Sequence, residues 1–153
     1  MKRLICTTVL LAAATATVNV RADEVRACNF EVKARCASGD ARVTLGNGTV
    51  KRIDVNVFWC GLPGRPGYTC TIDSTRGSSD AKWSDDGGAT LISNTSPWSA
   101  ALPDRIKVTV DRDVSLDFKE TQSLGRCGAG AELPETLVIP AQKGACRVQF
   151  TPP

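Results

Sequence analysis

The sequence contains no histidine, and this absence removes several kinds of active site. Ser-His-Asp and Cys-His catalytic arrangements use an imidazole as general base, and most catalytic zinc sites use it as a ligand. The sequence also lacks a Cys-x-x-Cys pair, so a structural zinc site has no ligand pattern to start from. The enzyme chemistry that survives is that of paired carboxylates, as in glycoside hydrolysis. We expect no cofactor and no metal centre built on cysteine.

Aromatic residues and long apolar runs are also scarce. Aromatics make up 5% of the chain, so a core has few large side chains to draw on. One apolar run, from Leu4 to about Val18, follows the basic start Met1-Lys2-Arg3 and precedes small residues up to Ala22. This layout predicts a signal peptide over residues 1–22, with cleavage after Ala22 or, as second choice, after Ala16. Residues 23–153 then form a single exported domain without a membrane span, secreted or periplasmic behind a bacterial-type leader.

Neither sign of charge is in excess once the leader is removed. The full chain carries 19 Lys and Arg against 16 Asp and Glu. Three of the basic residues, Lys2, Arg3 and Arg21, belong to the leader, whereas all the acidic residues follow it. The mature domain is therefore formally neutral. We expect neither nucleic acid nor an anionic membrane as a partner.

Cysteine is the feature that the mature chain does have. Cys6 leaves with the leader, and six remain: Cys28, Cys36, Cys60, Cys70, Cys127 and Cys146. An even number in an exported chain indicates three disulfides, which six cysteines can form in about 15 ways.

One of these pairings is excluded by strand geometry. Residues 28–36 alternate between apolar and polar side chains, as a half-buried strand does. Eight residues at about 3.3 Å each place Cys28 and Cys36 roughly 26 Å apart, whereas a disulfide spans about 4.4–6.8 Å between Cα atoms. We predict instead a Cys60–Cys70 bond across a central hairpin, with Cys28 and Cys36 reaching the two C-terminal cysteines.

The alternation predicts an antiparallel meander of three strands in the first half of the domain. A four-residue loop at 37–40 would place Cys36 opposite Ala41, and a three-residue loop at 46–48 would place Ala41 opposite Ile53. A two-residue Asn-Gly turn in the second loop would turn charged residues inward. The expected inner face consists of Phe30, Val32, Ala34, Val43, Leu45, Ile53, Val55, Val57 and Trp59.

The second half reads as shorter strands between turns. Residues 73–104 are rich in Ser, Asp and Gly, with two candidate short strands at 82–84 and 89–93. Residues 105–120 favour a hairpin that pairs Val110 with Val114, the alternative being one bent strand. A glycine-rich loop at 121–132 and a last hairpin over 136–150 complete the chain. The sequence thus predicts an all-β fold, a small antiparallel β-sandwich or barrel of about eight strands, stapled by disulfides.

Candidate binding residues lie in the loops. Leu62 and Arg65 occupy a Pro- and Gly-rich tip at 61–67, which a neighbouring disulfide would hold rigid for contact with a partner. Trp83 and Trp98 are either exposed anchors for a partner or plugs at the ends of the sandwich.

A cluster of carboxylates supplies two further hypotheses. Asp80, Asp85 and Asp86 lie near Trp83 in the sequence, an arrangement that suits a carboxylate-based hydrolase or oxygen ligation of calcium. Solvated turn residues give the same pattern.

These features favour an exported, non-enzymatic binding or inhibitor-like module whose partner is a protein or glycan of the export compartment. The alternatives are a structural, envelope-associated domain without a ligand and a carboxylate-based hydrolase.

Overall fold

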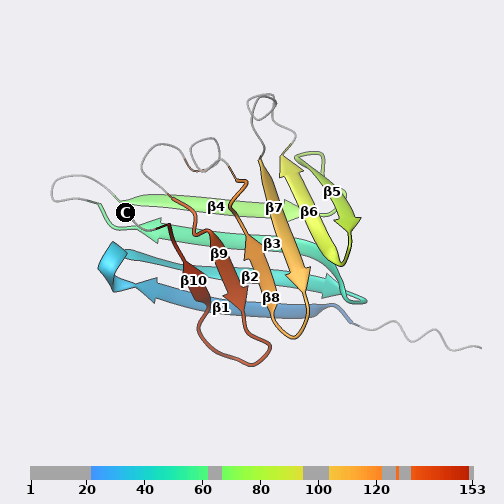
Figure 1. Ribbon diagram of the computed structural model, residues 1–153, viewed down its shortest axis with the longest axis horizontal. Helices are drawn as coiled ribbons and strands as arrows, with labels where there is room; N and C mark the ends of the chain where they lie inside the picture. The colour runs from blue at the N-terminus through green and yellow to red at the C-terminus, as the bar shows by residue number, and fades with distance from the viewer. Residues whose placement is uncertain (1–21, 62–66, 95–103, 122–126, 128–131, 152–153) are drawn as a thin grey trace, which may run out of the picture.

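The computed structural model describes residues 22–61, 67–94, 104–121, 127 and 132–151, which form two antiparallel sheets packed face to face (Figure 1). Sheet A has the order β1-β2-β3-β4 and sheet B the order β10-β9-β8-β7-β6-β5. The strands of sheet A are β1 (Glu24–Val32), β2 (Ala37–Gly46), β3 (Thr49–Trp59) and β4 (Tyr68–Thr75). Those of sheet B are β5 (Ala81–Asp86), β6 (Ala89–Asn94), β7 (Arg105–Val110), β8 (Val114–Asp117), β9 (Thr136–Ile139) and β10 (Arg147–Gln149). The all-β prediction is confirmed, and these are ten strands rather than about eight.

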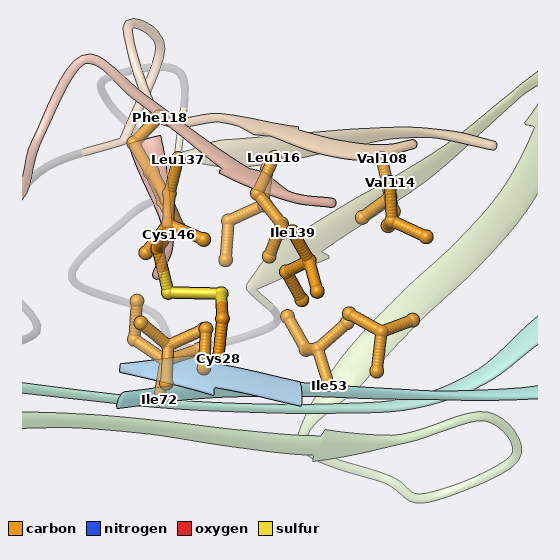
Figure 2. Packing of buried hydrophobic residues seen from close by; sticks show 14 of the residues in the cluster. Cys28, Ile53, Ile72, Val108, Val114, Leu116, Phe118, Leu137, Ile139 and Cys146 are labelled. Atoms are coloured by element: carbon orange, nitrogen blue, oxygen red, sulfur yellow. A yellow bond between two sulfur atoms is a disulfide. The ribbon is translucent and has the colours of Figure 1, made fainter. Parts of the chain in front are cut away.

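Within each sheet every strand pairs with its neighbour in sequence, so both sheets are meanders. The strands of sheet B cross obliquely over those of sheet A (Figure 1). Two separate sheets make the architecture a β-sandwich rather than a single closed barrel. The core between them is mainly Val, Ile and Leu, with Phe30 and Phe118 as its buried aromatics. Figure 2 shows Ile53 and Ile72 of sheet A facing Leu116, Leu137 and Ile139 of sheet B.

The first hairpin turns earlier than predicted. β1 ends at Val32, and a single 3-10 turn, η1 (Lys33–Arg35), leads into the left-handed Cys36. Ala41 therefore faces Cys28 rather than Cys36. This shift is even, so the residues of β1 and β2 keep their predicted faces although their partners change. Ala34, which was expected on the inner face, is exposed in η1.

Gly39 fixes this register through close packing. It lies opposite Phe30 in the ladder. A Cβ at Gly39 would lie 2.7 Å from the Phe30 ring and 2.1 Å from the carbonyl oxygen of Asn56. Only glycine leaves room for the ring and the neighbouring strand together.

The second hairpin uses the two-residue turn that the prediction rejected. Asn47 and Gly48 both have positive φ, and Leu45 faces Val50. The register then shifts between Thr44 and Leu45, which leaves Lys51 as the extra residue of a β-bulge. The bulge turns Ile53 inward as well as Val50, so the three-residue loop was not needed to keep the charged residues outside.

Most strands of the second half lie where the sequence placed them. The two candidate strands in 73–104 exist as β5 and β6, and Val110 faces Val114 in the predicted β7–β8 hairpin. The same segment also includes the end of β4. Among the residues with assigned positions, no helix is long and apolar enough to cross a membrane.

All six cysteines from Cys28 onward form disulfides, and the predicted pairing was right for Cys28, which reaches a C-terminal cysteine, but wrong for Cys36, Cys60 and Cys70. The bonds are Cys28–Cys146, Cys36–Cys60 and Cys70–Cys127. The Cys60–Cys70 bond is absent because these residues do not lie opposite each other: Cys70 faces Val57, with its side chain in the core. Cys36 leaves its strand for the turn and meets the end of β3, so it does not reach the C-terminal cysteines. The exclusion of Cys28–Cys36 is confirmed.

Two of the three bonds differ clearly in location and in access. Cys28–Cys146 is buried and joins β1 to the segment before β10, and Figure 2 shows it reaching from sheet A to sheet B. We call it the inter-sheet bridge. Cys36–Cys60 lies at the sandwich surface, with both residues exposed, and we call it the exposed bridge.

Candidate functional site

A hollow on the outer face of sheet B is the candidate site. It encloses about 320 Å³, near the lower end of the range for small-molecule sites. We call it the sheet B groove, and it is lined by Asp86, Ala89, Leu91, Arg105, Lys107, Asp117, Lys119 and Glu120. These side chains come from four neighbouring segments, because outward positions of adjacent strands lie side by side.

The strand register sets the layout of the sheet B groove. Ala89 and Leu91 of β6 form an apolar floor. Lys107 of β7 lies opposite Leu91 on one side and opposite Asp117 of β8 on the other. Asp86 lies opposite Ala89, at the end of β5. The floor therefore has a carboxylate on the β5 side and all three cations on the β7–β8 side.

Part of this charge is compensated within the protein. The Arg105 guanidinium donates to the Glu120 carboxylate, with Nε to Oε2 at 2.8 Å, and the two form an ion pair. Asp117 accepts from the backbone N–H of Lys119 at 3.0 Å. Lys107, Lys119 and Asp86 have no ion pair within the part of the chain that the structure describes.

Trp83 lies at one end of the sandwich, away from the sheet B groove. It is partly buried against the core, and the Arg76 guanidinium stands 5.2 Å from its ring centre. The other end holds Trp59, edge-on to Phe150 at 5.3 Å, with its indole N–H donating to the Glu132 carbonyl at 3.0 Å. Trp83 and Trp59 are therefore both partly buried, and each is held by contacts within the domain.

Asp85 is engaged by a network that joins the two sheets. Arg76 donates to both Asp85 carboxylate oxygens, at 2.7 and 3.0 Å, and to the Val50 carbonyl of sheet A at 2.9 Å. Thr90 donates to Asp85 at 2.8 Å. The hydrogen bonds from Arg76 and then Thr90 lower the pKa of Asp85 below its ordinary value. Asp85 remains ionised at neutral pH and serves as the anchor of the Arg76 side chain.

Two of the predicted carboxylates, Asp85 and Asp86, are adjacent on β5 and therefore point to opposite faces of the sheet. Asp85 points to the side of Arg76 and Thr90, whereas Asp86 points into the sheet B groove. These two carboxylates do not face each other across a cleft, as an acid pair of a hydrolase would. Within the described ranges, no three Asp, Glu, Cys or His side chains are gathered as metal ligands. Asp80 precedes β5 and does not line the groove.

Of the predicted contact residues, one lies in the sheet B groove. This is Asp86, while Leu62, Arg65 and Trp98 lie outside the described residues. The groove residues of β7 and β8 were not predicted, although their signal was present in the sequence: Arg105, Lys107 and Asp117 are outward positions of the alternating segment 105–120. Alternation shows which residues face outward, but not which outward residues surround a hollow.

Fold and site together define a small, disulfide-crosslinked β-sandwich with a charged groove on one outer face. Comparison with protein-family models, with curated proteins and with solved structures finds no match for this chain.

Proposed function

We propose that the protein is a non-enzymatic binding module of an oxidising export compartment and that it holds its ligand in the sheet B groove. The observation that carries this proposal is the groove itself, in which an apolar floor is bordered by three side chains, Asp86, Lys107 and Lys119, that have no ion pair among the described residues. Uncompensated charges beside apolar surface offer a ligand both orientation and desolvation energy.

The scaffold supports binding more than catalysis. Three disulfides are typical of secreted and periplasmic proteins, in agreement with the leader expected at residues 1–22. Crosslinked sheets hold outward side chains in place, so little conformational entropy is lost when a ligand binds. The alternatives are an envelope-associated structural domain, which requires no groove, and a carboxylate-based hydrolase, which requires two facing carboxylates, whereas Asp85 and Asp86 point to different sides.

Chemical-shift mapping tests this proposal. The oxidised, ¹⁵N-labelled protein is mixed with a low-molecular-mass extract of the culture medium, and amide shifts are recorded. We expect shifts at Ala89, Leu91 and Lys107, and we expect them to disappear in Lys107→Glu. The matched control is Lys82→Glu, which reverses the charge at an exposed position of β5 that does not line the groove. Shifts that avoid the groove, or that survive equally in both variants, would refute it.

A further inference from the structure

The layout of charge in the sheet B groove indicates which class of ligand it takes. Resting on the function proposed above, we propose that the groove binds a short zwitterionic peptide, with the peptide ammonium at Asp86 and its carboxylate at Lys107 and Lys119. The floor of Ala89 and Leu91 would contact the peptide side chains and Cα atoms.

The first argument is that the groove is bipolar rather than uniformly charged. It has three cationic and three anionic side chains, so a purely anionic or purely cationic ligand meets as much repulsion as attraction. Because Arg105 and Glu120 neutralise each other, the unpaired charges are those of Asp86 on the β5 side and of the two lysines on the β7–β8 side. Asp117 lies opposite Lys107 in the ladder and accepts a hydrogen bond from the backbone N–H of Lys119. A ligand that carries both signs, one at each end, matches this arrangement.

The second argument is one of length. Asp86 and Lys107 are separated by two strand spacings across the sheet and by two residues along it. Adjacent strands lie about 4.8 Å apart and each residue rises about 3.4 Å, which puts the two Cα atoms roughly 12 Å apart. Strand side chains stand roughly perpendicular to the sheet, so the two charged groups lie roughly as far apart as their Cα atoms. An α-amino acid is too short for this distance even with a hydrogen bond of about 2.9 Å at each end, whereas an extended peptide of two or three residues, at about 3.3–3.6 Å per residue, spans it.

The third argument is the apolar floor between the charges. Leu91 faces outward on β6 yet is partly buried, and Ala89 is 8% exposed. Small and aliphatic side chains in the middle of an outer face leave space above the sheet, bordered by the longer charged side chains. A peptide backbone without a large side chain fits a hollow of about 320 Å³.

The test uses trialanine in four forms: free, N-acetylated, C-amidated and blocked at both ends. Titration of the oxidised full domain, followed by amide shifts and calorimetry, should show groove binding that is tightest for the free form. Exposed ion pairs are individually weak, so we expect each blocked terminus to reduce affinity by roughly two- to five-fold.

Two variants assign each terminus to its partner. Asp86→Asn should bind the free and N-acetylated peptides equally, and Lys107→Gln/Lys119→Gln should bind the free and C-amidated peptides equally. Lys82→Gln is the control and should discriminate as the natural protein does. Melting temperatures of the variants verify that each has folded.

Two results would overturn the inference. If the blocked forms shift the groove amides as strongly as free trialanine, the groove binds ligands but does not select zwitterions, and the proposed function stands without this ligand class. If no form shifts the groove amides, the peptide assignment is wrong, and the extract experiment with Lys107→Glu decides the proposed function separately.

Discussion

Removing the inter-sheet bridge should destabilise the domain by an amount set by loop closure. The perturbation is the double substitution Cys28→Ala/Cys146→Ala. The bond joins residues 118 positions apart and is buried between the sheets. The backbone N–H of Cys146 also donates to the Asn29 carbonyl at 2.9 Å, a contact that the substitution leaves in place. The bridge therefore stabilises the fold mainly by restricting the unfolded chain.

The other two bridges reduce the stability that is lost with the inter-sheet bridge. A free loop of 118 residues would correspond to about 4.9 kcal/mol. With the remaining bridges intact, however, the two cysteines stay connected through three chain stretches of about 37 residues in all, and the loop-closure relation then gives about 3.8 kcal/mol. The exposed bridge closes 24 residues and corresponds to about 3.4 kcal/mol. For a domain of this size the larger loss lowers the melting temperature on the order of 10–20 °C.

Urea and thermal unfolding followed by circular dichroism measure these losses. Cys36→Ala/Cys60→Ala is the control, because it removes an exposed bond and leaves no core cavity. We expect both variants to lose between about 3 and 5 kcal/mol, with the inter-sheet variant losing slightly more. A loss below about 1 kcal/mol for the inter-sheet variant, beside a full loss for the control, would refute the loop-closure reasoning.

Three further predictions follow from the geometry. Stepwise reduction with glutathione should open the exposed bridge before the inter-sheet bridge, because an attacking thiolate needs access to sulfur. Alkylation and mass mapping measure the order of reduction, and the reverse order would contradict this. Asp85→Asn should lower the melting temperature at neutral pH. The difference in melting temperature between variant and natural protein should vanish as pH falls through the lowered pKa of Asp85, because protonation removes the same charge from the Arg76 pair. A lower melting temperature of the variant that persists in acid would contradict this. Gly39→Ala should lower the free energy of unfolding by more than about 1–3 kcal/mol, because its Cβ would overlap the Phe30 ring. Gly144→Ala, whose Cβ would have its nearest contact 3.7 Å away, is the control and should be tolerated. Equal melting temperatures of the two variants would show that the strands move apart freely.

The alternation of side chains was enough to find the strands but not to pair them. Val110 and Val114 were predicted to lie opposite each other, and they do. The first hairpin was given the wrong partners, because any even shift leaves apolar residues on the same face. What selects one register is the fit of Phe30 over Gly39, which is a contact between strands and cannot be read from either strand alone.

The disulfide errors have a related cause. The prediction joined Cys60 to Cys70 because they flank one hairpin. In the structure Cys60 ends β3 at the surface, whereas Cys70 faces the core. Which sulfurs meet depends on how the sheets stack and where each strand stops, and these are properties of the assembled fold.

The candidate site was only partly accessible from the sequence. Asp86 was singled out together with Asp85, yet neighbouring positions of a strand point to opposite faces, and the two carboxylates have different surroundings. The lysines of β7 and β8 had no motif to mark them. Their importance depends on Ala89 and Leu91 lying between them in space, and the ladder across β6, β7 and β8 decides that.

The sequence by itself determined the class of this protein: two-sided strands, six crosslinked cysteines and no histidine define a disulfide-bonded all-β domain. Those properties are local, because the period of the side chains and the chemistry of each residue type do not depend on distant partners. Register, disulfide pairing and the sheet B groove were decided by the tertiary structure, since each requires the packing of strands that are far apart along the chain.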